Sequence, residues 1–311
     1  MIVINMKDGL GNQMFEYGFA KYLQKINGDR IVINNFFFDG KKRKSYSLHH
    51  FKLDGEVKVI KKPKQIWYTM CFVTRLMTTY KMDFVRWMTS KKRPKGDAKF
   101  EKAARSGMYV NFEAFHPFDI PSSKKRVKYI YGNYENYKYI EPVIDELRDE
   151  FSIVSAPSAA NAKMIEELSS CEAVCVHIRR GDYLAPQWKS LNVCTFEYYQ
   201  NAINEIARVH PNAKFYIFSN THDDLEWIRE NYHFDQEMNY VDLGNCDYEE
   251  LRLMSCCSHF VISNSTFSWW AAVLSKSTDK MVTAPEKWIL NNQDEDCKKG
   301  LYLDDWHMIP I

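Results

Sequence analysis

The sequence predicts two α/β domains, each built on a parallel β-sheet with helices packed on its faces. At 311 residues the chain exceeds the length at which a single hydrophobic core usually stops growing. Its composition, 45% hydrophobic and 15% aromatic with nearly balanced charges, is typical of a folded globular protein. Short apolar runs alternate with stretches of helical periodicity, most regularly after residue 160, and this alternation is typical of parallel sheets.

The first domain is expected to span residues 1–155 and to begin with a strand, a glycine turn and a helix. Residues 1–5 are apolar and β-prone, Gly9 and Gly11 follow, and an apolar pattern with helical spacing then runs to Asn27-Gly28, a typical helix end. The other elements expected here are a strand at 30–38, two short strands between 107 and 140, and a helix at 141–151.

A basic segment, residues 41–102, belongs to this domain and holds 18 Lys and Arg against 5 Asp and Glu. Apolar residues recur within it at steps of four and three, which predicts one helix with an apolar stripe of Ile66, Met70, Val73, Met77, Tyr80, Phe84 and Trp87. Two interpretations stay open. Either the stripe packs on the first domain as an ordinary helix, or it gives the protein a peripheral contact with anionic membrane.

The second domain is expected to span residues 156–290, after the linker-like run from Ser155 to Ser158. A tail, residues 291–311, is expected to pack back on the domains. Such doubly wound sheets bind ligands at the carboxyl ends of their strands. The predicted strands are 173–178, 214–219, 240–243 and 259–263, and the predicted helices are 159–168, 196–209, 223–231, 248–256 and one that begins near 268.

Several classes of protein are disfavoured. The first residues carry no basic and apolar leader, and no 18 consecutive apolar residues occur, so we expect a cytoplasmic protein that is neither secreted nor membrane-spanning. Eight cysteines without a Cys-x-x-Cys pair are expected to be free thiols in a reducing compartment. A net charge of +2 gives no reason to expect a nucleic acid as partner.

Polar side chains gather where predicted strands end. His177, Arg179, Arg180 and Asp182 follow one strand, and guanidinium groups form bidentate bonds with phosphate oxygens. The run Asn264 to Ser268 follows another strand at the start of a helix, where free N–H groups attract anions. With the glycine turn of the first domain, these groups predict a nucleoside-diphosphate site between two domains.

Five motifs resemble the bacterial α-1,2-fucosyltransferase family, glycosyltransferase family 11: Gly9 to Phe15, His177 to Tyr183, Phe218-Ser219-Asn220, Leu253-Met254-Ser255 and Asn264 to Trp270. The resemblance implies a GT-B-like fold of two Rossmann-like domains with a nucleotide-sugar cleft between them. It also implies inverting transfer of L-fucose from GDP-fucose to the 2-hydroxyl of a terminal galactose, as in O-antigen or capsule glycans. Asp8 stands where a Gly is frequent, Glu16 where Gln is usual, and Glu250 where an Asp is frequent.

The resemblance also suggests roles for single residues. Arg179 would hold the β-phosphate, where charge develops as GDP leaves. Asp182 is the first candidate for the catalytic base, unless the acceptor hydroxyl needs only a hydrogen bond that positions it. Asn12 is the alternative, because its glycine turn also resembles that of protein O-fucosyltransferases, which implies an Asn close to the reacting carbon. Residues expected to bind GDP-fucose are His177, Arg179, Arg180, Ser219, Asn220, Glu250, Asn264, Ser265, Thr266, Phe267, Ser268, Gly11, Asn12 and Gln13.

The same residues also have structural interpretations: His177 as a core histidine, the hydroxyls of Ser265, Thr266 and Ser268 as helix caps, and Glu250 as a solvent-facing helix residue. No metal or other cofactor is expected, since Asp294-Glu295-Asp296 follows no apolar strand and is interpreted as a solvated loop. Two alternative functions remain: a noncatalytic carbohydrate- or nucleotide-binding protein, and a glycosyltransferase that uses a different GDP-sugar.

Overall fold

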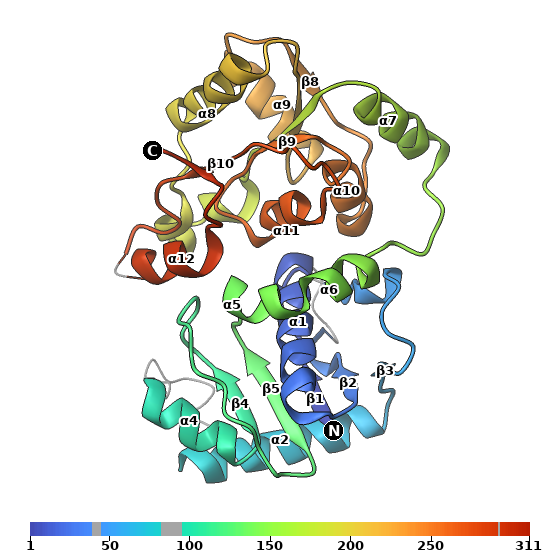
Figure 1. The fold of residues 1–311 in the computed structure, drawn as a ribbon, viewed down its shortest axis with the longest axis vertical. Helices are drawn as coiled ribbons and strands as arrows, with labels where there is room; N and C mark the ends of the chain where they lie inside the picture. Colours follow the sequence, from blue (N-terminus) through green and yellow to red (C-terminus); the bar gives the residue numbers. More distant parts are fainter. Residues whose placement is uncertain (39–44, 82–94, 292) are drawn as a thin grey trace. The chain divides into compact units, whose positions relative to one another are not determined.

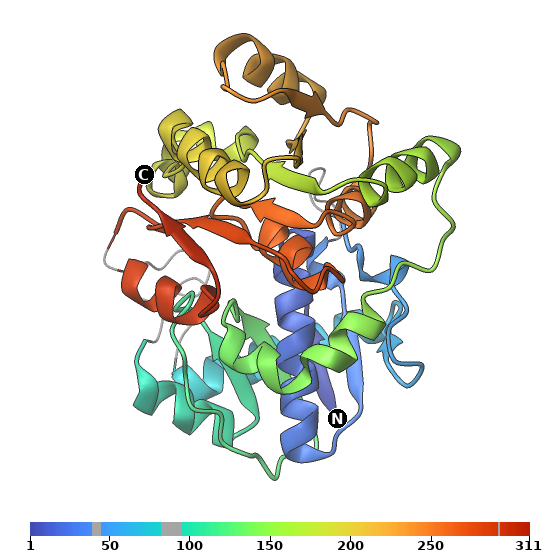
Figure 2. The ribbon, with the colours of Figure 1, turned by 45° about the horizontal axis from the view of Figure 1, so that its top comes forward.

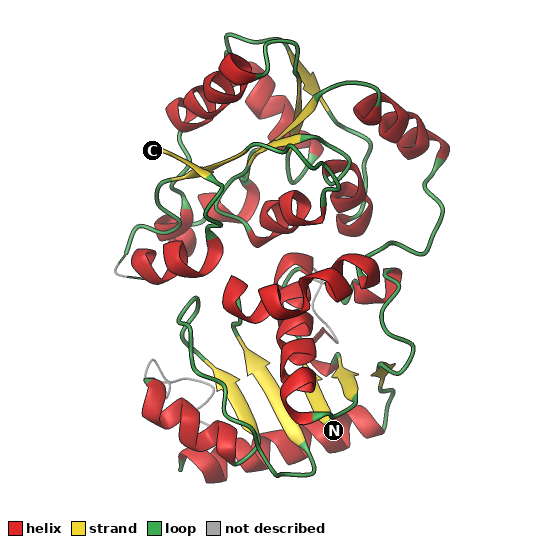
Figure 3. Cartoon of the chain, viewed as in Figure 1, coloured by secondary structure: helices red, strands yellow, loops and turns green. Residues whose placement is uncertain are grey.

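The computed structural model describes residues 1–38, 45–81, 95–291 and 293–311, and the chain divides into two compact units, Met1–Ser152 and Ile153–Ile311 (Figure 1). Each unit contains one β-sheet flanked by helices (Figure 3). Every strand pair among the described residues is parallel, which confirms the predicted α/β class.

The sheet of the first unit has the strand order β3-β2-β1-β5-β4. Its strands are β1 (Ile2–Asn5), β2 (Ile31–Asn34), β3 (Lys58–Val59), β4 (Met108–Asn111) and β5 (Lys128–Gly132). Its α-helices are α1 (Leu10–Asn27), α2 (Lys64–Tyr80), α4 (Asp97–Arg105), α5 (Tyr137–Ile140) and α6 (Ile144–Glu150). Short 3₁₀ turns lie at Phe36–Phe38, Leu48–His50 and Glu141–Val143.

Glycines end one helix and one strand of this unit. Gly28 ends α1 with a left-handed φ of 66° and returns its N–H to the carbonyl of Gln24, as the Asn-Gly pair predicts. Gly132 ends β5 at φ 124°, and a Cβ there would lie 1.7 Å from the carbonyl oxygen of Asn111 on β4. Only glycine therefore allows β4 and β5 to pair at this point.

Helix α2 requires a correction to the predicted apolar stripe. The helix exists, and it lies on the opposite side of the sheet from α1 (Figure 1). Its buried residues are Gln65, Thr69, Phe72 and Leu76, whereas Ile66 and Met70 of the predicted stripe are exposed. Val73 and Tyr80 of the stripe are half-buried and pack against the core of the first unit, so the stripe is the packing face only in part. Its last two members, Phe84 and Trp87, lie outside the described residues.

The sheet of the second unit has the order β11-β10-β9-β6-β7-β8. Its strands are β6 (Ala173–His177), β7 (Lys214–Phe218), β8 (Met238–Tyr240), β9 (His259–Val261), β10 (Val282–Pro285) and β11 (His307–Ile309). Its α-helices are α7 (Ala159–Ser169), α8 (Phe196–Val209), α9 (His222–Asn231), α10 (Asp247–Met254), α11 (Thr266–Leu274) and α12 (Asp294–Leu301). Two 3₁₀ segments, η4 (Gly181–Leu184) and η5 (Pro186–Leu191), follow β6.

Alternate residues of β6 face opposite sides of this sheet. Helices α8 and α11 lie on opposite sides of this sheet (Figure 2). Val174 and Val176 pack in one core with residues of α8 and α9, whereas the ring of His177 lies 6.0 Å from the ring of Phe267 on α11. The end of the chain belongs to the same sheet, because β11 pairs with β10.

Two further features are the lengths of the apolar helices and the state of the cysteines. No helix of the described residues is long and apolar enough to cross a bilayer. All eight cysteines are free, as predicted, and Cys175, Cys257 and Cys297 are buried.

Candidate functional site

The carboxyl ends of β6, β7 and β9 lie side by side because these strands are neighbours in the second sheet. The imidazole Nδ1 of His177 lies 2.9 Å from the hydroxyl oxygen of Ser263, which follows β9. Burial, with the nearby charge of Arg179, lowers the pKa of His177 to about 3, so the ring is neutral at physiological pH. His177 is thus a buried, neutral side chain that is hydrogen-bonded at the carboxyl end of β6. At physiological pH its ring does not take up a proton.

Arg179 and Arg180 leave the end of β6 in different surroundings. The guanidinium of Arg179 lies 5.1 Å from the centre of the Tyr183 ring. The guanidinium of Arg180 lies 3.2 Å from the ring centre of Trp227 and 3.5 Å from a carboxylate oxygen of Asp224, both on α9. These partners were not apparent in the sequence, because α9 follows Arg180 by more than 40 residues. The contact of Arg180 with GDP stays a prediction.

The amino end of α11 lies at the same edge. Ser265 caps it, because its hydroxyl accepts a hydrogen bond from the N–H of Phe267 at 3.3 Å. The hydroxyl of Ser268 is buried and donates to the carbonyls of Ser263 and Ser265. Ser265 and Ser268 therefore have the structural role expected of helix caps, and Thr266 is half-buried at the first helical position.

Other predicted residues also bond within the second unit. Asn264 donates to the carbonyls of Leu191 and Trp288, both at 2.8 Å. Ser219 donates to the carbonyl of Ile178, and Asn220 accepts from the N–H of Arg180 at 3.3 Å. The bonds of Ser219 and Asn220, with the bond between His177 and Ser263, hold the ends of β6, β7 and β9 together. The structure thus brings three of the four motifs of the second domain to one edge.

Glu250 on α10 is half-buried and accepts a hydrogen bond from Asn245 at 3.2 Å. Burial raises the pKa of Glu250 to about 7, against the bond from Asn245, and the charge of Asp242 adds to the rise. The neighbouring Glu249 is buried and bonds to Arg252 and Asn161. The carboxyl of Glu250 is therefore half-buried, with a pKa raised towards physiological pH.

The two candidates for the group that acts on the acceptor hydroxyl, Asp182 and Asn12, lie in different units. The backbone of Asp182 lies in η4, but its side chain is outside the part of the chain that the structure describes. In the first unit, Gly11 and Asn12 lie in the first turn of α1 after the amino-terminal cap at Gly9. The side chain of Gln13 is fully buried and bonds to the backbone of Asp8, Ser45 and Ser47, so it fastens the segment 45–47 onto the glycine turn.

A charged cluster at the carboxyl edge of the first sheet was missed by sequence reasoning. The ammonium of Lys7 is paired with Asp8 and donates to Asn133 at 3.0 Å, and the N–H of Lys7 donates to Glu16. Burial lowers the pKa of Lys7, but the carboxyls of Glu16, Asp8 and Glu135 outweigh it and raise the pKa. Burial also raises the pKa of Glu135 to about 6. The unusual residues Asp8 and Glu16 were the signal in the sequence.

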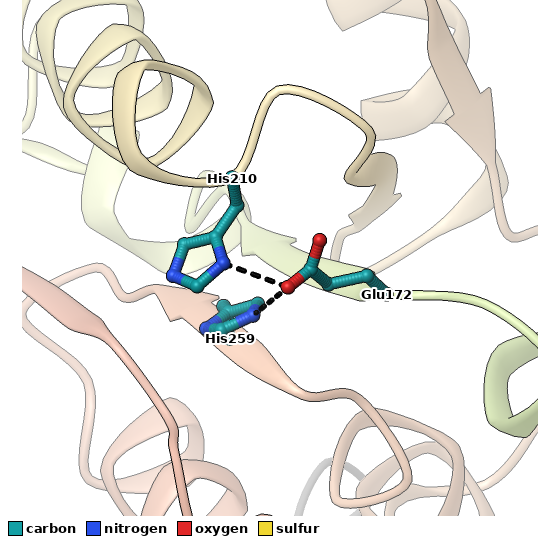
Figure 4. A group of neighbouring side chains, drawn as sticks. All are labelled: Glu172, His210 and His259. Carbon is teal, nitrogen blue, oxygen red and sulfur yellow. Dashed lines mark hydrogen bonds and ion pairs between the residues drawn. The ribbon is translucent and has the colours of Figure 1, made fainter.

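One group of side chains in the described part of the chain has the composition of a metal site: Glu172, His210 and His259 (Figure 4). One oxygen of Glu172 lies 2.7 Å from Nδ1 of His210 and 3.3 Å from Nε2 of His259. However, Nδ1 of His259 accepts the N–H of Met281 at 3.0 Å, so the ring carries its proton on Nε2. The group is therefore a hydrogen-bonded junction at the amino ends of β6 and β9, away from the predicted donor edge.

The prediction that Asp294-Glu295-Asp296 is a solvated loop is wrong. These residues form the first turn of α12, and Asp294 is only 9% exposed. Its carboxylate accepts the N–H groups of Trp288 and Ile289 and pairs with Lys298. The acids begin a helix, where the macrodipole favours negative charge, and their structural role is clear without a metal ligand.

Comparison with known proteins gives a consistent assignment. A family model described as Glycosyl transferase family 11 matches residues 1–310. An α-1,2-colitosyltransferase of Escherichia coli is 27% identical over 93% of this chain and 92% of its own length. The O-antigen biosynthesis glycosyltransferase WbnK of Escherichia coli is 28% identical over 97% of this chain and 98% of its own length.

Among solved structures, NodZ α-1,6-fucosyltransferase co-crystallised with GDP matches this chain with a TM-score of 0.50 and 15% identity, over 88% of this chain and 92% of NodZ. At this identity the match concerns the fold. With the two parallel-sheet units, it confirms the predicted GT-B-like architecture.

Proposed function

The chain belongs to glycosyl transferase family 11, and from this premise we propose that it transfers L-fucose from GDP-fucose to the 2-hydroxyl of a galactose in a glycan, with inversion. The name of the full-length α-1,2-colitosyltransferase relative supports an α-1,2 linkage. The GDP and the fucosyl activity named for NodZ support the donor. The name of WbnK supports an O-antigen type of acceptor.

One observation carries the donor site: Arg179 leaves the second sheet beside buried, neutral His177 and near the amino end of α11. A guanidinium and a helix amino terminus are both suited to a pyrophosphate. Arg179 stabilises the charge that develops on GDP, and Thr266 with the first N–H groups of α11 contacts the same phosphates. Glu250 accepts the N–H groups of guanine, a donor pair that matches a carboxylate.

The proton of the acceptor hydroxyl needs a destination. In an inverting transfer, a base beside the hydroxyl accepts that proton as the bond to the anomeric carbon forms and GDP leaves. Asp182 is the proposed base, and Asn12 is the alternative as a group that only positions the hydroxyl. The pKa of His177 excludes it from this role.

A second donor is favoured by a specific observation. The relative named α-1,2-colitosyltransferase matches over nearly its whole length, and colitose is fucose without its 3-hydroxyl. The two sugars present the same GDP and the same reacting carbon. The chain would then differ from a fucosyltransferase only in the groups that meet that hydroxyl.

The test is a donor and acceptor screen. The purified chain is incubated with GDP-fucose, GDP-colitose or GDP-mannose and with lactose or type 1 and type 2 galactosides, and NMR determines the linkage of each product. We expect an α-1,2-fucosylated galactose, and faster transfer from GDP-colitose would instead select the second donor. GDP binding in isothermal titration without transfer to any acceptor would contradict the enzymatic proposal and favour a noncatalytic nucleotide-binding protein.

The compartment is a further proposal. We place the protein in the cytoplasm, where its eight free cysteines would stay reduced. Fractionation with a periplasmic and a cytoplasmic marker checks this.

A further inference from the structure

Helix α2 turns a group of large apolar side chains outward near its amino end. Trp67 is 66% exposed, Met70 62% and Ile66 43%, and Trp67 is the most exposed large apolar side chain among the described residues. Residues three and four apart are neighbours on a helix surface, so Met70 adjoins both Trp67 and Ile66. Single exposed apolar residues need no explanation, whereas a group of this kind marks an interaction surface.

The opposite face of α2 is already fixed to the first unit. Phe72 and Leu76 lie in a core with Val3 and Tyr129. Thr69 accepts a hydrogen bond from Asn34 at 2.9 Å, and Arg75 donates to the carbonyls of Val127 and Ser106. The helix therefore cannot rotate its exposed group inward without the loss of these contacts.

Lysines come directly before the exposed group in the chain. Lys58, Lys61, Lys62 and Lys64 are all exposed, and between residues 58 and 81 the chain has six basic residues and no acidic one. The first turn of α2 contains no acid. Lysines beside the amino end of a helix oppose its macrodipole and do not stabilise the helix. Their accumulation at this end is explained if an anionic partner meets them.

We propose that this surface, defined by Ile66, Trp67 and Met70 with Lys58, Lys61, Lys62 and Lys64 before them in the chain, binds an anionic lipid bilayer at the level of its headgroups. An indole suits the boundary between headgroups and acyl chains, the two aliphatic side chains enter the acyl region, and the ammonium groups meet phosphates. A stable protein interface buries roughly 800 Å² on each partner, which three side chains do not supply, whereas a bilayer requires no matching surface. The inference does not depend on the proposed enzymatic activity.

The experiment is sedimentation of the full-length protein with vesicles. We expect binding to vesicles that contain phosphatidylglycerol, none to pure phosphatidylcholine, and release at high salt. Trp67→Ala with Met70→Ala should lower the partition coefficient by at least about tenfold, the factor that burial of one large apolar side chain is worth. Lys61→Gln with Lys64→Gln should lower it about 25-fold at low salt, since each lysine near the surface contributes about a factor of five.

Matched controls lie in the second unit. Val154 is 65% exposed and Lys163 on α7 is exposed, so Val154→Ala and Lys163→Gln should leave sedimentation unchanged. Trp67→Phe should remove most of the blue shift of tryptophan fluorescence on vesicle binding, although seven other tryptophans remain. No sedimentation with anionic vesicles at low salt, or equal binding of the Trp67 and Met70 double variant, overturns the proposal. So does a dimer in light scattering that dissociates in this variant, because a second copy of the chain would then cover the surface.

Discussion

Arg179 and Arg180 allow the phosphate contact to be tested with one chemical change at two adjacent positions. A lysine keeps the charge but loses the bidentate fork. We expect Arg179→Lys to lower kcat by roughly two to three orders of magnitude, because the bond that stabilises the leaving GDP is lost. Arg180→Lys should instead cost about 1 kcal/mol of stability, since its guanidinium stacks on Trp227, and should lower kcat far less.

The measurement is steady-state kinetics with GDP-fucose, and thermal unfolding of both variants serves as the control. A folded Arg179→Lys enzyme with near-normal turnover would reject the phosphate role. An equal loss of kcat in Arg180→Lys would show that the two arginines act together on the donor.

Glu250 should make GDP binding depend on pH. Its pKa is raised to about 7, and only the ionised carboxylate accepts both N–H groups of guanine. As pH falls below 7, binding must expel a proton from Glu250, so the Kd for GDP should rise about tenfold per pH unit. Isothermal titration between pH 5.5 and 8 measures this.

Glu250→Gln is the matched variant for that titration, because it removes the proton but leaves the titration of the phosphate itself. The difference between the two pH profiles isolates the carboxylate. Parallel profiles, or an unchanged preference for GDP over ADP in Glu250→Gln, would remove Glu250 from the guanine site.

The cluster around Lys7 shows where residue-level prediction ends. The sequence draws attention to Asp8 and Glu16 as unusual residues in a recognisable motif, but neither periodicity nor spacing connects them with Lys7 and Glu135. Asp8 adopts a left-handed φ of 65°, a conformation that glycine adopts without strain, which fits the frequent glycine there. In this chain the aspartate at that position forms an ion pair with Lys7, which a glycine could not form.

At the scale of the element, α2 has two faces with opposite expected sensitivity. Phe72 is fully buried, so Phe72→Ala should destabilise the protein by about 3–5 kcal/mol. Trp67 is 66% exposed, so Trp67→Ala should change stability by less than about 0.5 kcal/mol. Denaturant unfolding of both variants decides this, and a large loss in Trp67→Ala would mean that another part of the chain covers the helix.

The predicted stripe was right only in part, because Val73 and Tyr80 pack on the core whereas Ile66 and Met70 are exposed. Periodicity in hydrophobicity finds the core face of a helix only when that face is apolar. The core face of α2 includes Gln65 and Thr69, which are buried because they bond to Asn35 and Asn34. Ile66 and Met70, which follow Gln65 and Thr69 in the sequence, therefore gave the stronger hydrophobic periodicity. They lie on a face of α2 that is turned partly towards solvent.

Most other elements were predictable, and the exceptions are short. α1, α8 and the strands β6 and β7 lie within a few residues of their predicted limits, since each has a strong pattern and a clear end. β10 contains a proline and β11 has three residues, so neither has a pattern of its own. Their pairing with β9 and with each other comes from tertiary contacts, as does the capping role of Asp294.

At the scale of the whole molecule, the motifs predicted the GT-B-like architecture better than any single element. Four of the five motifs lie at the carboxyl end of a strand, and the fifth, Leu253-Met254-Ser255, ends helix α10, so their order along the chain reflects the order of a repeated α/β plan. The acceptor could not be predicted this way. Groups that recognise a glycan come from segments between regular elements, where the sequence has no periodicity.

The last prediction concerns metal ions and involves two groups of acidic or histidine side chains, one at Asp294 and one at Glu172 with His210 and His259. Asp294 is committed to backbone N–H groups and to Lys298, and His259 carries its proton on the nitrogen that faces Glu172. The proposed donor site instead offers Arg179 and the amino end of α11, which can neutralise a pyrophosphate unaided. We therefore expect fucosyl transfer to survive dialysis against EDTA with little change and to gain little from added Mn²⁺ or Mg²⁺. If EDTA abolishes transfer and Mn²⁺ restores it, the expectation is wrong, and Asp296→Asn and Glu172→Gln would then show which group holds the ion.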